Sequence, residues 1–491
     1  MRNQVQLITY ADRLGGGGLA DLHRLLTGPL QGLFGGVHIL PFFYPIDGAD
    51  AGFDPIDHTV VDPRLGSWAD IQALSRGVDV MADLIVNHVS TRSPQFQDYS
   101  QKGEKSPYSG LFLTLGSVFP TGATEAELLK IYRPRPGLPF TYASLKNGTK
   151  RILWTTFTSQ QVDIDVLHPQ GEAYLKSILK TFQENGVSLI RLDAVGYAIK
   201  KPSTSCFMIP ETFDFIGELS GYAKSLGIEV LVEVHSYYRQ QIAIAGRVDR
   251  VYDFALPPLI LHAFYNRTAR ILKHWLAISP RNAVTVLDTH DGIGVIDVGA
   301  DSKDPVSAAG LIPPEELDTL VETIHEKSGG QSRLATGAAA SNLDLYQVNC
   351  TYYDALGQND RDYLLARAIQ FFAPGIPQVY YVGLMAGEND MELLAKTNVG
   401  RDINRPYYDW PEVEKALEKP VVQDLMRLIR FRNTHPAFDG TFTLQDTENH
   451  VLGLGWDKAG EWAQLVIDFA SGTYELSYSD KGQVRQLNWI V

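Results

Sequence analysis

The chain has 491 residues, which is too long for one small domain and suits a large barrel with an additional domain. Its 44% hydrophobic and 10% aromatic content excludes a disordered protein. Its net charge of −14 argues against nucleic-acid and anionic-membrane partners, because both require a basic face.

The cysteine content and the N-terminus indicate the compartment. Cys206 and Cys350 lack the spacing of a zinc site and favour a reduced environment. The N-terminal residues lack the apolar segment and cleavage site of a secretory signal, and no apolar stretch is long enough to cross a bilayer. We therefore expect a soluble, cytoplasmic enzyme.

Short apolar segments alternate with helical patterns along the chain, which is typical of βα units. Between two of these segments, Ser188–Asp193 and Glu229–Val234, Pro210 and Gly227 bound a helix whose apolar residues recur every three or four positions. A closed barrel needs eight strands. The eight expected strands are Val5–Tyr10, Gly36–Leu40, Val78–Val86, Ser188–Asp193, Glu229–Val234, Val251–Leu256, Ala283–Asp288 and Gln378–Val382.

Two intervals between strands are too long for one helix, so we expect inserted lobes at 87–165, after the third strand, and at 292–353, after the seventh. The second insert contains a helix near Pro313–Lys327. Alternating apolar residues in 436–491 predict a small antiparallel β domain. The predicted fold is α/β, a (β/α)8 TIM barrel formed by 1–86, 166–291 and 354–435, with these lobes and this C-terminal domain.

Three of the expected strands end in, or are soon followed by, an acidic residue: Asp193, Glu233 and Asp291. The carboxyl ends of parallel barrel strands meet at one rim, where barrel enzymes perform their chemistry. One such acid is commonly a helix cap or a structural ion pair. Three of them, with His235 and His290 beside two, indicate a catalytic site.

With these motifs, the chain resembles the α-amylase-type glycoside hydrolase family, and within it the sucrose phosphorylases. The resemblance covers almost the whole chain and rests on QLITYADRLG, DGADAGFDPIDH, DLIVNHVS, IRLDAVGY, EVHSYY, VLDTHDGIGV, SNLDLYQVN and GRDINR. It implies a retaining double displacement that uses two carboxylates. By motif position, Asp193 is the nucleophile, Glu233 is the acid/base, and Asp291 binds glucosyl hydroxyls and helps to distort the ring.

The resemblance also implies the contacts to glucose. His88 and His290 bind glucosyl hydroxyls, and Asp50 and Arg401 clamp the far hydroxyls. Phe53 and Phe157 stack on the sugar ring, because apolar sugar faces favour aromatic partners. Arg191 lies two residues before Asp193 on the same strand face and is expected to keep that carboxylate ionised. The expected substrate-binding residues are Asp50, Phe53, His88, Phe157, Arg191, His235, His290, Arg135, Leu343, Asp344, Tyr346, Gln347 and Arg401.

The acceptor contacts come from two loops. Arg135 lies in IYRPRPG, where alternating prolines stiffen the loop and lower the entropic cost of presenting a guanidinium to an anion. By resemblance, Arg135 and Tyr346 bind phosphate, whereas Asp344 and Gln347 hold fructose. A solvated basic loop beside a proline turn is the alternative interpretation of the Arg135 motif.

We expect neither a metal nor a cofactor. Many family members hold a structural calcium near the motif that contains Asn87, but the inserted lobe lacks a dense Asp/Asn cluster that would complete its oxygen ligands. The expected substrates and products are sucrose, phosphate, α-D-glucose 1-phosphate and fructose, and the resemblance favours a homodimer. Three alternatives stay open: a phosphorylase of sucrose 6'-phosphate, glucosylglycerol or glucosylglycerate, a sucrose hydrolase or transglucosidase, and a catalytically inactive sugar-binding homologue.

Overall fold

The structure is a computed structural model that describes residues 1–47, 51–135, 137–301, 308–336 and 347–489. A closed barrel of parallel strands forms its centre, and β1 closes it by pairing with both β3 and β17. The barrel strands are β1 (Gln6–Thr9), β3 (Gly36–Ile39), β6 (Asp79–Ile85), β11 (Leu189–Asp193), β12 (Glu229–Val232), β13 (Arg250–Asp253), β14 (Ala283–Thr285) and β17 (Ile376–Tyr380). Each overlaps one expected strand, so the predicted barrel is confirmed.

The period of two along β11 explains how the barrel carries polar groups inside. Ile190 and Leu192 face outward and join the main hydrophobic core between strands and helices. Leu189 instead belongs to the small cluster that fills the barrel interior, together with Leu231 and Val284. Because residues i and i+2 share a face, Arg191 and Asp193 also point inward from β11.

Helices surround the barrel, and their limits follow local signals. Helix α7 (Pro210–Ser225) has Pro210 in its first turn and is followed by Gly227 at φ +77°, as the sequence predicts. The other helices of the barrel layer are α1 (Leu19–Thr27), α2 (Trp68–Ser75), α6 (Pro169–Glu184), α8 (Tyr238–Ala245), α9 (Leu256–Asn266), α10 (Arg270–Ile278), α14 (Asp360–Phe372), α15 (Tyr381–Leu384), α16 (Met391–Thr397), α17 (Trp410–Leu417) and α18 (Pro420–Thr434).

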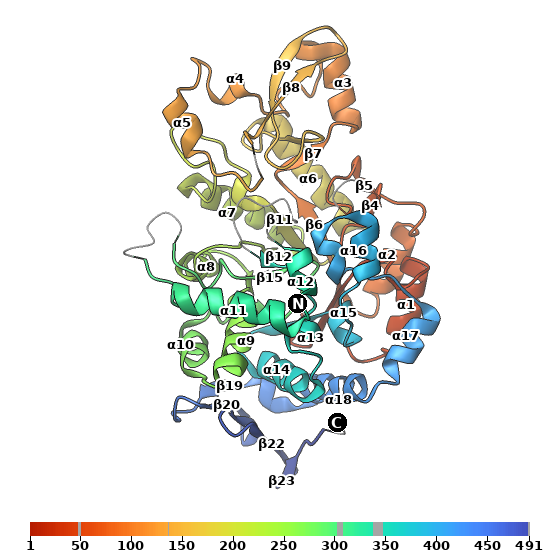
Figure 1. The fold of residues 1–491 in the computed structure, drawn as a ribbon. Coiled ribbons are helices and arrows are strands. Elements are labelled where there is room, and N and C mark those ends of the chain that lie inside the picture. The colour runs from red at the N-terminus through yellow and green to blue at the C-terminus, as the bar shows by residue number, and fades with distance from the viewer. Residues whose placement is uncertain (48–50, 136, 302–307, 337–346, 490–491) are drawn as a thin grey trace.

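Two inserts stand beside the carboxyl ends of the strands. The first forms a lobe at the top of Figure 1 and contains β7 (His88–Ser90), α3 (Pro94–Lys102), α4 (Leu115–Val118), α5 (Glu125–Lys130), β8 (Phe140–Ser144), β9 (Lys150–Trp154) and β10 (Gln161–Asp163). The second follows β14 and contains β15 (Ile293–Gly294), α11 (Pro314–Lys327), α12 (Gln331–Leu334), β16 (Gln347–Val348) and α13 (Tyr352–Ala355). Both lie where the sequence predicts inserts.

A five-stranded antiparallel sheet lies at the opposite end of the molecule (Figure 1). Its strands are β19 (Thr441–Leu444), β20 (Val451–Lys458), β21 (Glu461–Asp468), β22 (Thr473–Asp480) and β23 (Gln483–Gln486). The indole of Trp456 donates to the Phe372 carbonyl at the end of α14, which fastens the sheet to the barrel. The predicted C-terminal β domain is thus present, whereas its limits and those of the other domains stay predictions. Among the described residues, no helix is long and apolar enough to cross a membrane.

Candidate active site

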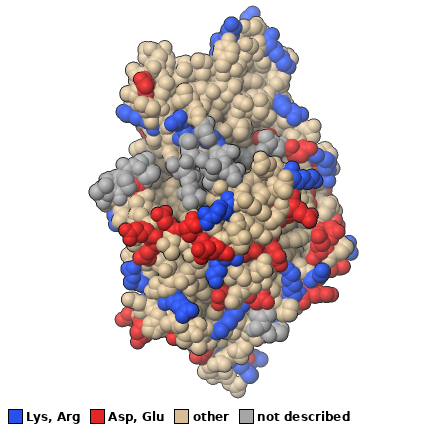
Figure 2. Space-filling view, in the orientation of Figure 1, with Lys and Arg blue, Asp and Glu red and all other residues tan. Residues whose placement is uncertain are grey.

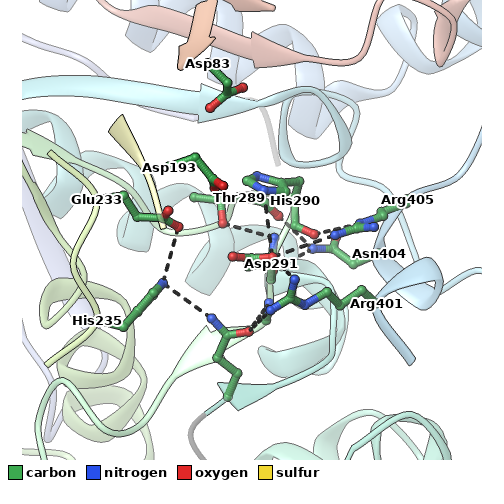
Figure 3. Close-up of polar contacts among 12 residues, drawn as sticks. Asp83, Asp193, Glu233, His235, Thr289, His290, Asp291, Arg401, Asn404 and Arg405 are labelled. Carbon is green, nitrogen blue, oxygen red and sulfur yellow. Dashed lines mark hydrogen bonds and ion pairs between the residues drawn. The ribbon is translucent and has the colours of Figure 1, made fainter. Parts of the chain in front are cut away.

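A cavity of about 500 Å³ opens at the carboxyl ends of the barrel strands, a size typical of small-molecule sites. Asp193 ends β11, Glu233 directly follows β12, and Asp291 lies between β14 and β15, so three elements bring the three acids together (Figure 3). The predicted site residues that line the cavity are Phe53, His88, Arg135, Phe157, Asp193, Glu233, His235, His290, Asp291, Gln347 and Arg401. Asp50, Leu343, Asp344 and Tyr346 lie outside the described residues.

The buried guanidinium of Arg191 connects the acids beneath this cavity. Its Nη1 lies 3.2 Å from Asp193 Oδ1 and 2.5 Å from Asp83 Oδ1. Its Nη2 lies 2.5 Å from Glu233 Oε1. The sequence predicts the contact with Asp193, but the guanidinium is shared among three carboxylates because β6, β11 and β12 are neighbours in the barrel.

At this cluster the ion pairs have a larger effect on the pKa values than burial has. Burial alone would lower the pKa of Arg191, but Glu233, Asp83 and Asp193 hold it well above its usual value. Burial would likewise raise the pKa of Asp83, yet His38 and Arg191 lower it to about 2. Arg191 therefore stays charged, and Asp83 stays ionised beneath the floor of the cavity.

Asp291 is held by the GRDINR segment. Arg401 Nη1 lies 2.9 Å from Asp291 Oδ1, and Arg405 Nη2 lies 3.7 Å from the same oxygen. Burial opposes ionisation, but the guanidinium groups of Arg401 and Arg405 keep the pKa of Asp291 far below its ordinary value. Asn404 Nδ2 also donates to the backbone oxygen atoms of Thr289 and Asp291. Sequence reasoning identified Arg401 but missed Asn404 and Arg405, although they belong to the same motif.

Aromatic and imidazole rings form the deep wall beside Asp291. Phe53 stacks on His290 with ring centroids 5.0 Å apart and an interplanar angle of 11°. Phe157 packs edge-on against His88 at 5.4 Å, and His88 Nε2 donates to the Phe53 carbonyl oxygen at 3.0 Å. Burial, followed by the positive charges of Arg191 and Arg405, holds the pKa of His290 well below its usual value. His290 is therefore neutral, and its buried Nδ1 has no hydrogen-bond partner among the described residues.

His235 occupies the side of the cavity between Glu233 and Gln347. Its Nδ1 contacts Asp297 Oδ2 at 2.9 Å, while its Nε2 lies 4.0 Å from Glu233 Oε1 and 3.4 Å from Gln347 Nε2. Burial alone would lower the pKa of His235, but Asp297 and, less strongly, Glu233 raise it. Sequence reasoning missed Asp297, which is separated from His235 by 61 intervening residues and lies in the second insert.

The outer wall of the cavity combines basic and aromatic groups. Arg135 and Tyr132 come from the proline-rich loop of the first insert. Tyr132 stacks on Phe207 at 4.6 Å, and Phe207 packs against Tyr197 at the same distance. Acidic side chains form a band across the middle of the face in Figure 2, below the first insert. An anion that enters this acidic molecule therefore requires local cations such as Arg135.

Two clusters of side chains offer ligand atoms of the kind that metals bind. Ligand atoms of Glu233, His235 and Asp291 lie within 4.8 Å of one another. Arg191 and Arg401 already neutralise the two acids, so we assign no metal ligand there.

The second cluster is the motif around Asn87. The ammonium of Lys200 lies 2.9 Å from Asn87 Oδ1 and 2.8 Å from Asp163 Oδ2, and it also contacts the Tyr197 carbonyl oxygen. The Lys200 ammonium thus supplies these oxygen atoms with the positive charge that a bound metal cation would otherwise provide. The absence of a structural metal stays a prediction, with Lys200 as its physical reason.

Comparison with known proteins supports the interpretation of this geometry. The family model "Alpha amylase, catalytic domain" matches residues 32–251. The sucrose phosphorylase of Agrobacterium vitis is 63% identical over 487 residues, which cover 98% of this chain and 99% of the relative. The chain belongs to the α-amylase family, in its sucrose phosphorylase branch.

Two further relatives of this α-amylase-family protein agree. The sucrose phosphorylase of Bifidobacterium adolescentis is 57% identical over 96% of this chain and 92% of the relative. The crystal structure of sucrose 6F-phosphate phosphorylase from Thermoanaerobacter thermosaccharolyticum superposes with a TM-score of 0.91 at 39% identity, covering 100% of this chain and 98% of that one. The barrel and its inserts are thus arranged as in a phosphorylase of this family.

Proposed function

We propose that the protein is a sucrose phosphorylase, which converts sucrose and phosphate reversibly into α-D-glucose 1-phosphate and D-fructose. The observation that carries this proposal is one cavity with three strand-end carboxylates in its floor and Arg135 in its outer wall. The carboxylates suit glucosyl transfer, and the guanidinium suits an anionic acceptor. We also propose a cytoplasmic location and a homodimer. Light scattering after size-exclusion chromatography tests the homodimer.

The proposed mechanism is a retaining double displacement. Asp193 attacks the anomeric carbon of the glucosyl unit while Glu233 protonates the departing fructose oxygen. In the second step Glu233 removes the proton of the acceptor, which attacks the glucosyl ester from the same face. Arg191 favours the ionised form of Asp193, because its guanidinium lies 3.2 Å from that carboxylate.

Glu233 must carry a proton when it acts as the acid. In the ligand-free structure its Oε1 is instead paired with Arg191 Nη2 at 2.5 Å. A carboxyl group that gives its proton to the leaving oxygen must point at that oxygen and not at a guanidinium, so we infer that substrate binding loosens this pair. Asp83 competes for the same guanidinium and remains as its partner when Glu233 turns toward the leaving group.

The glucosyl unit is proposed to lie against the deep wall. Asp291 and Arg401 bind its hydroxyls, with Asp50 as the expected further contact. The neutral His290 offers Nδ1 to a hydroxyl, and His88 contributes to the same wall. The apolar faces of Phe53 and Phe157 suit the C–H face of a sugar ring.

Fructose and phosphate are proposed to use the outer part of the cavity in turn. Arg135 binds phosphate, and the expected partners of the two acceptors, Leu343, Asp344 and Tyr346, precede Gln347 along the chain. Gln347 lies at the cavity, where its Oε1 accepts from the Gly292 backbone at 3.3 Å. We propose that Gln347 contacts fructose from this position.

The test is the conversion of sucrose with and without phosphate, scored as glucose 1-phosphate against free glucose. Arg135→Ala should raise the phosphate KM about tenfold or more, because a charged hydrogen bond contributes roughly 1.5–3 kcal/mol. Hydrolysis of sucrose by water should change much less. Arg133→Ala is the matched control, since Arg133 lies on the same wall but donates to the Gly137 carbonyl oxygen. An unchanged phosphate KM in Arg135→Ala, or glucose as the main product of the wild type, would favour a hydrolase.

A further inference from the structure

Asp297 is a fully buried carboxylate that the proposed mechanism does not use. It lies just after β15, in the second insert, and accepts hydrogen bonds from the segment that follows Glu233. Its Oδ2 accepts from His235 Nδ1 at 2.9 Å. Its Oδ1 accepts from the Ser236 backbone at 3.1 Å and from Gln241 Nε2 at 2.7 Å. The second insert is thereby fastened to the loop that carries the acid/base.

The surroundings of Asp297 leave the His235 ring one orientation. Phe254 stacks on the imidazole with centroids 3.9 Å apart and an interplanar angle of 16°. On the other side, Gly294 gives Asp297 the room it needs, since a Cβ there would lie 2.3 Å from Asp297 Oδ2 and 3.5 Å from His235 Nδ1. A side chain at this position would displace the carboxylate from the imidazole.

This arrangement decides which ring nitrogen faces the reaction. A carboxylate can only accept, so His235 Nδ1 carries a proton and donates it to Asp297. Nε2 is left facing the cavity, where it accepts from the amide N–H of Gln347 at 3.4 Å and lies 4.0 Å from Glu233 Oε1. Asp291, from the segment between β14 and β15, is the third acid that acts on the ring, after Asp297 and Glu233. Arg191 on β11 is paired with Glu233, and Arg401 with Asp291.

We propose that Asp297 is a positioning residue for the glucosyl transfer proposed above. It fixes the His235 ring with Nε2 toward Glu233, and its negative charge favours a proton on Nε2 in the half-reaction in which Glu233 is a carboxylate. His235 keeps its Nδ1 proton throughout and transfers no proton to the substrate. This inference rests on the proposed function, because it assigns a role to Asp297 only if Glu233 acts as the base.

The test isolates the second half-reaction. With α-D-glucosyl fluoride as donor, the leaving group needs no proton, so kcat/KM for the fluoride reports the first step without acid catalysis. With saturating donor and fructose as acceptor, turnover falls at low pH as Glu233 becomes protonated. Asp297→Asn retains an oxygen for Ser236 and Gln241 but removes the charge beside His235. We expect the acidic limb of its pH–rate profile, the fall in turnover at low pH, to move upward by about 1 pH unit. This is the lower end of the effect of a charge at 4–6 Å, because the charge of Arg191 still acts on Glu233.

Two further variants make the result decisive. Gly294→Ala leaves Asp297 chemically intact but displaces it, and should move the limb in the same direction, which decides the matter if Asp297→Asn fails to fold. Gln241→Met removes the hydrogen bonds of Gln241 to Asp297 Oδ1 and to the Ser236 carbonyl oxygen but changes no charge, so it should leave the limb within about 0.2 pH units. In all three variants kcat/KM for the fluoride should stay within about threefold of wild type.

An unmoved acidic limb in Asp297→Asn or, where that variant does not fold, in Gly294→Ala overturns the proposal. An equal loss in both half-reactions without a shift also overturns it, since that is the signature of a merely structural residue. A failure of the proposed function can be told apart from a failure of this inference. If the proposed function were wrong, the wild type itself would form no sucrose from the fluoride and fructose.

Discussion

Lys200 provides the sharpest test of how this chain stabilises the junction between its barrel and its first insert. The side chain lies three residues beyond the 3₁₀ turn η2 (Val195–Tyr197), which follows the strand of Asp193, and its ammonium reaches Asp163 at the end of β10. Lys200 and Asp163 are both buried, with 2% and 0% of their side chains exposed. Replacing Lys200 by methionine keeps the aliphatic stem but leaves the carboxylate without its counter-charge.

The expected cost follows from this burial. Breaking a buried ion pair by removing one partner typically costs about 3–5 kcal/mol. Asp163 keeps two hydrogen bonds from Thr156, through its backbone N–H at 2.9 Å and its hydroxyl at 2.5 Å, so we expect the lower end, about 3 kcal/mol. For 491 residues the entropy of unfolding is about 1 kcal/mol per kelvin, so Tm should fall by about 3 °C.

Calorimetry with matched variants measures this effect. Lys201→Met is the control, because its ammonium is half exposed and pairs with Glu211 at the surface, and it should cost less than about 0.5 kcal/mol. Adding Asp163→Asn to Lys200→Met removes the isolated charge and should recover part of the loss. Millimolar calcium should leave the wild-type Tm unchanged. The reasoning fails if Lys200→Met is no less stable than Lys201→Met, or if calcium stabilises the wild type.

The proposed catalytic roles make two further predictions. Asp193→Asn should lower turnover by several orders of magnitude and leave the circular dichroism spectrum unchanged, because an amide cannot form the glycosyl ester. Residual activity above a few per cent would contradict the assignment. Glu233→Gln should lose most activity on sucrose but regain part of it in the first step with α-D-glucosyl fluoride, which needs no acid, so equal losses on both donors would argue against the acid/base role.

The barrel and its three strand-end acids could be predicted because the signals are local. A buried parallel strand is a short apolar segment, and the residue at its end faces the rim whatever the rest of the chain does. Asp193, Glu233 and Asp291 therefore needed no knowledge of packing. The strands expected at Glu229–Val234 and Ala283–Asp288 end earlier in the structure, at Val232 and Thr285, although apolar residues follow both ends.

The partners of these acids could not be predicted in the same way. Asp297 meets His235 only because the second insert folds back over the strand ends, and no spacing in the sequence encodes that approach. Arg191 was expected beside Asp193, two residues away on one strand, whereas its 2.5 Å contact with Glu233 depends on the register between β11 and β12. Lateral contacts of this kind arise from tertiary structure.

The position of Arg191 also explains how one cavity accommodates the proposed change of charge. In the first step Asp193 loses its negative charge to the ester, while Glu233 gains one by giving its proton to fructose. The charge thus moves from the nucleophile to the acid/base, and the Arg191 guanidinium contacts both carboxylates, so its cation remains beside the charge in either state.

Phosphate must then approach the side of the cavity that has just become negative. An acceptor that is itself an anion requires further cations there, and His235 and Arg135 are the groups on that side that supply them. Water and fructose carry no charge and do not need Arg135, which is why the phosphate dependence of the Arg135 variant, rather than its hydrolysis of sucrose, distinguishes a phosphorylase from a hydrolase built on the same three acids.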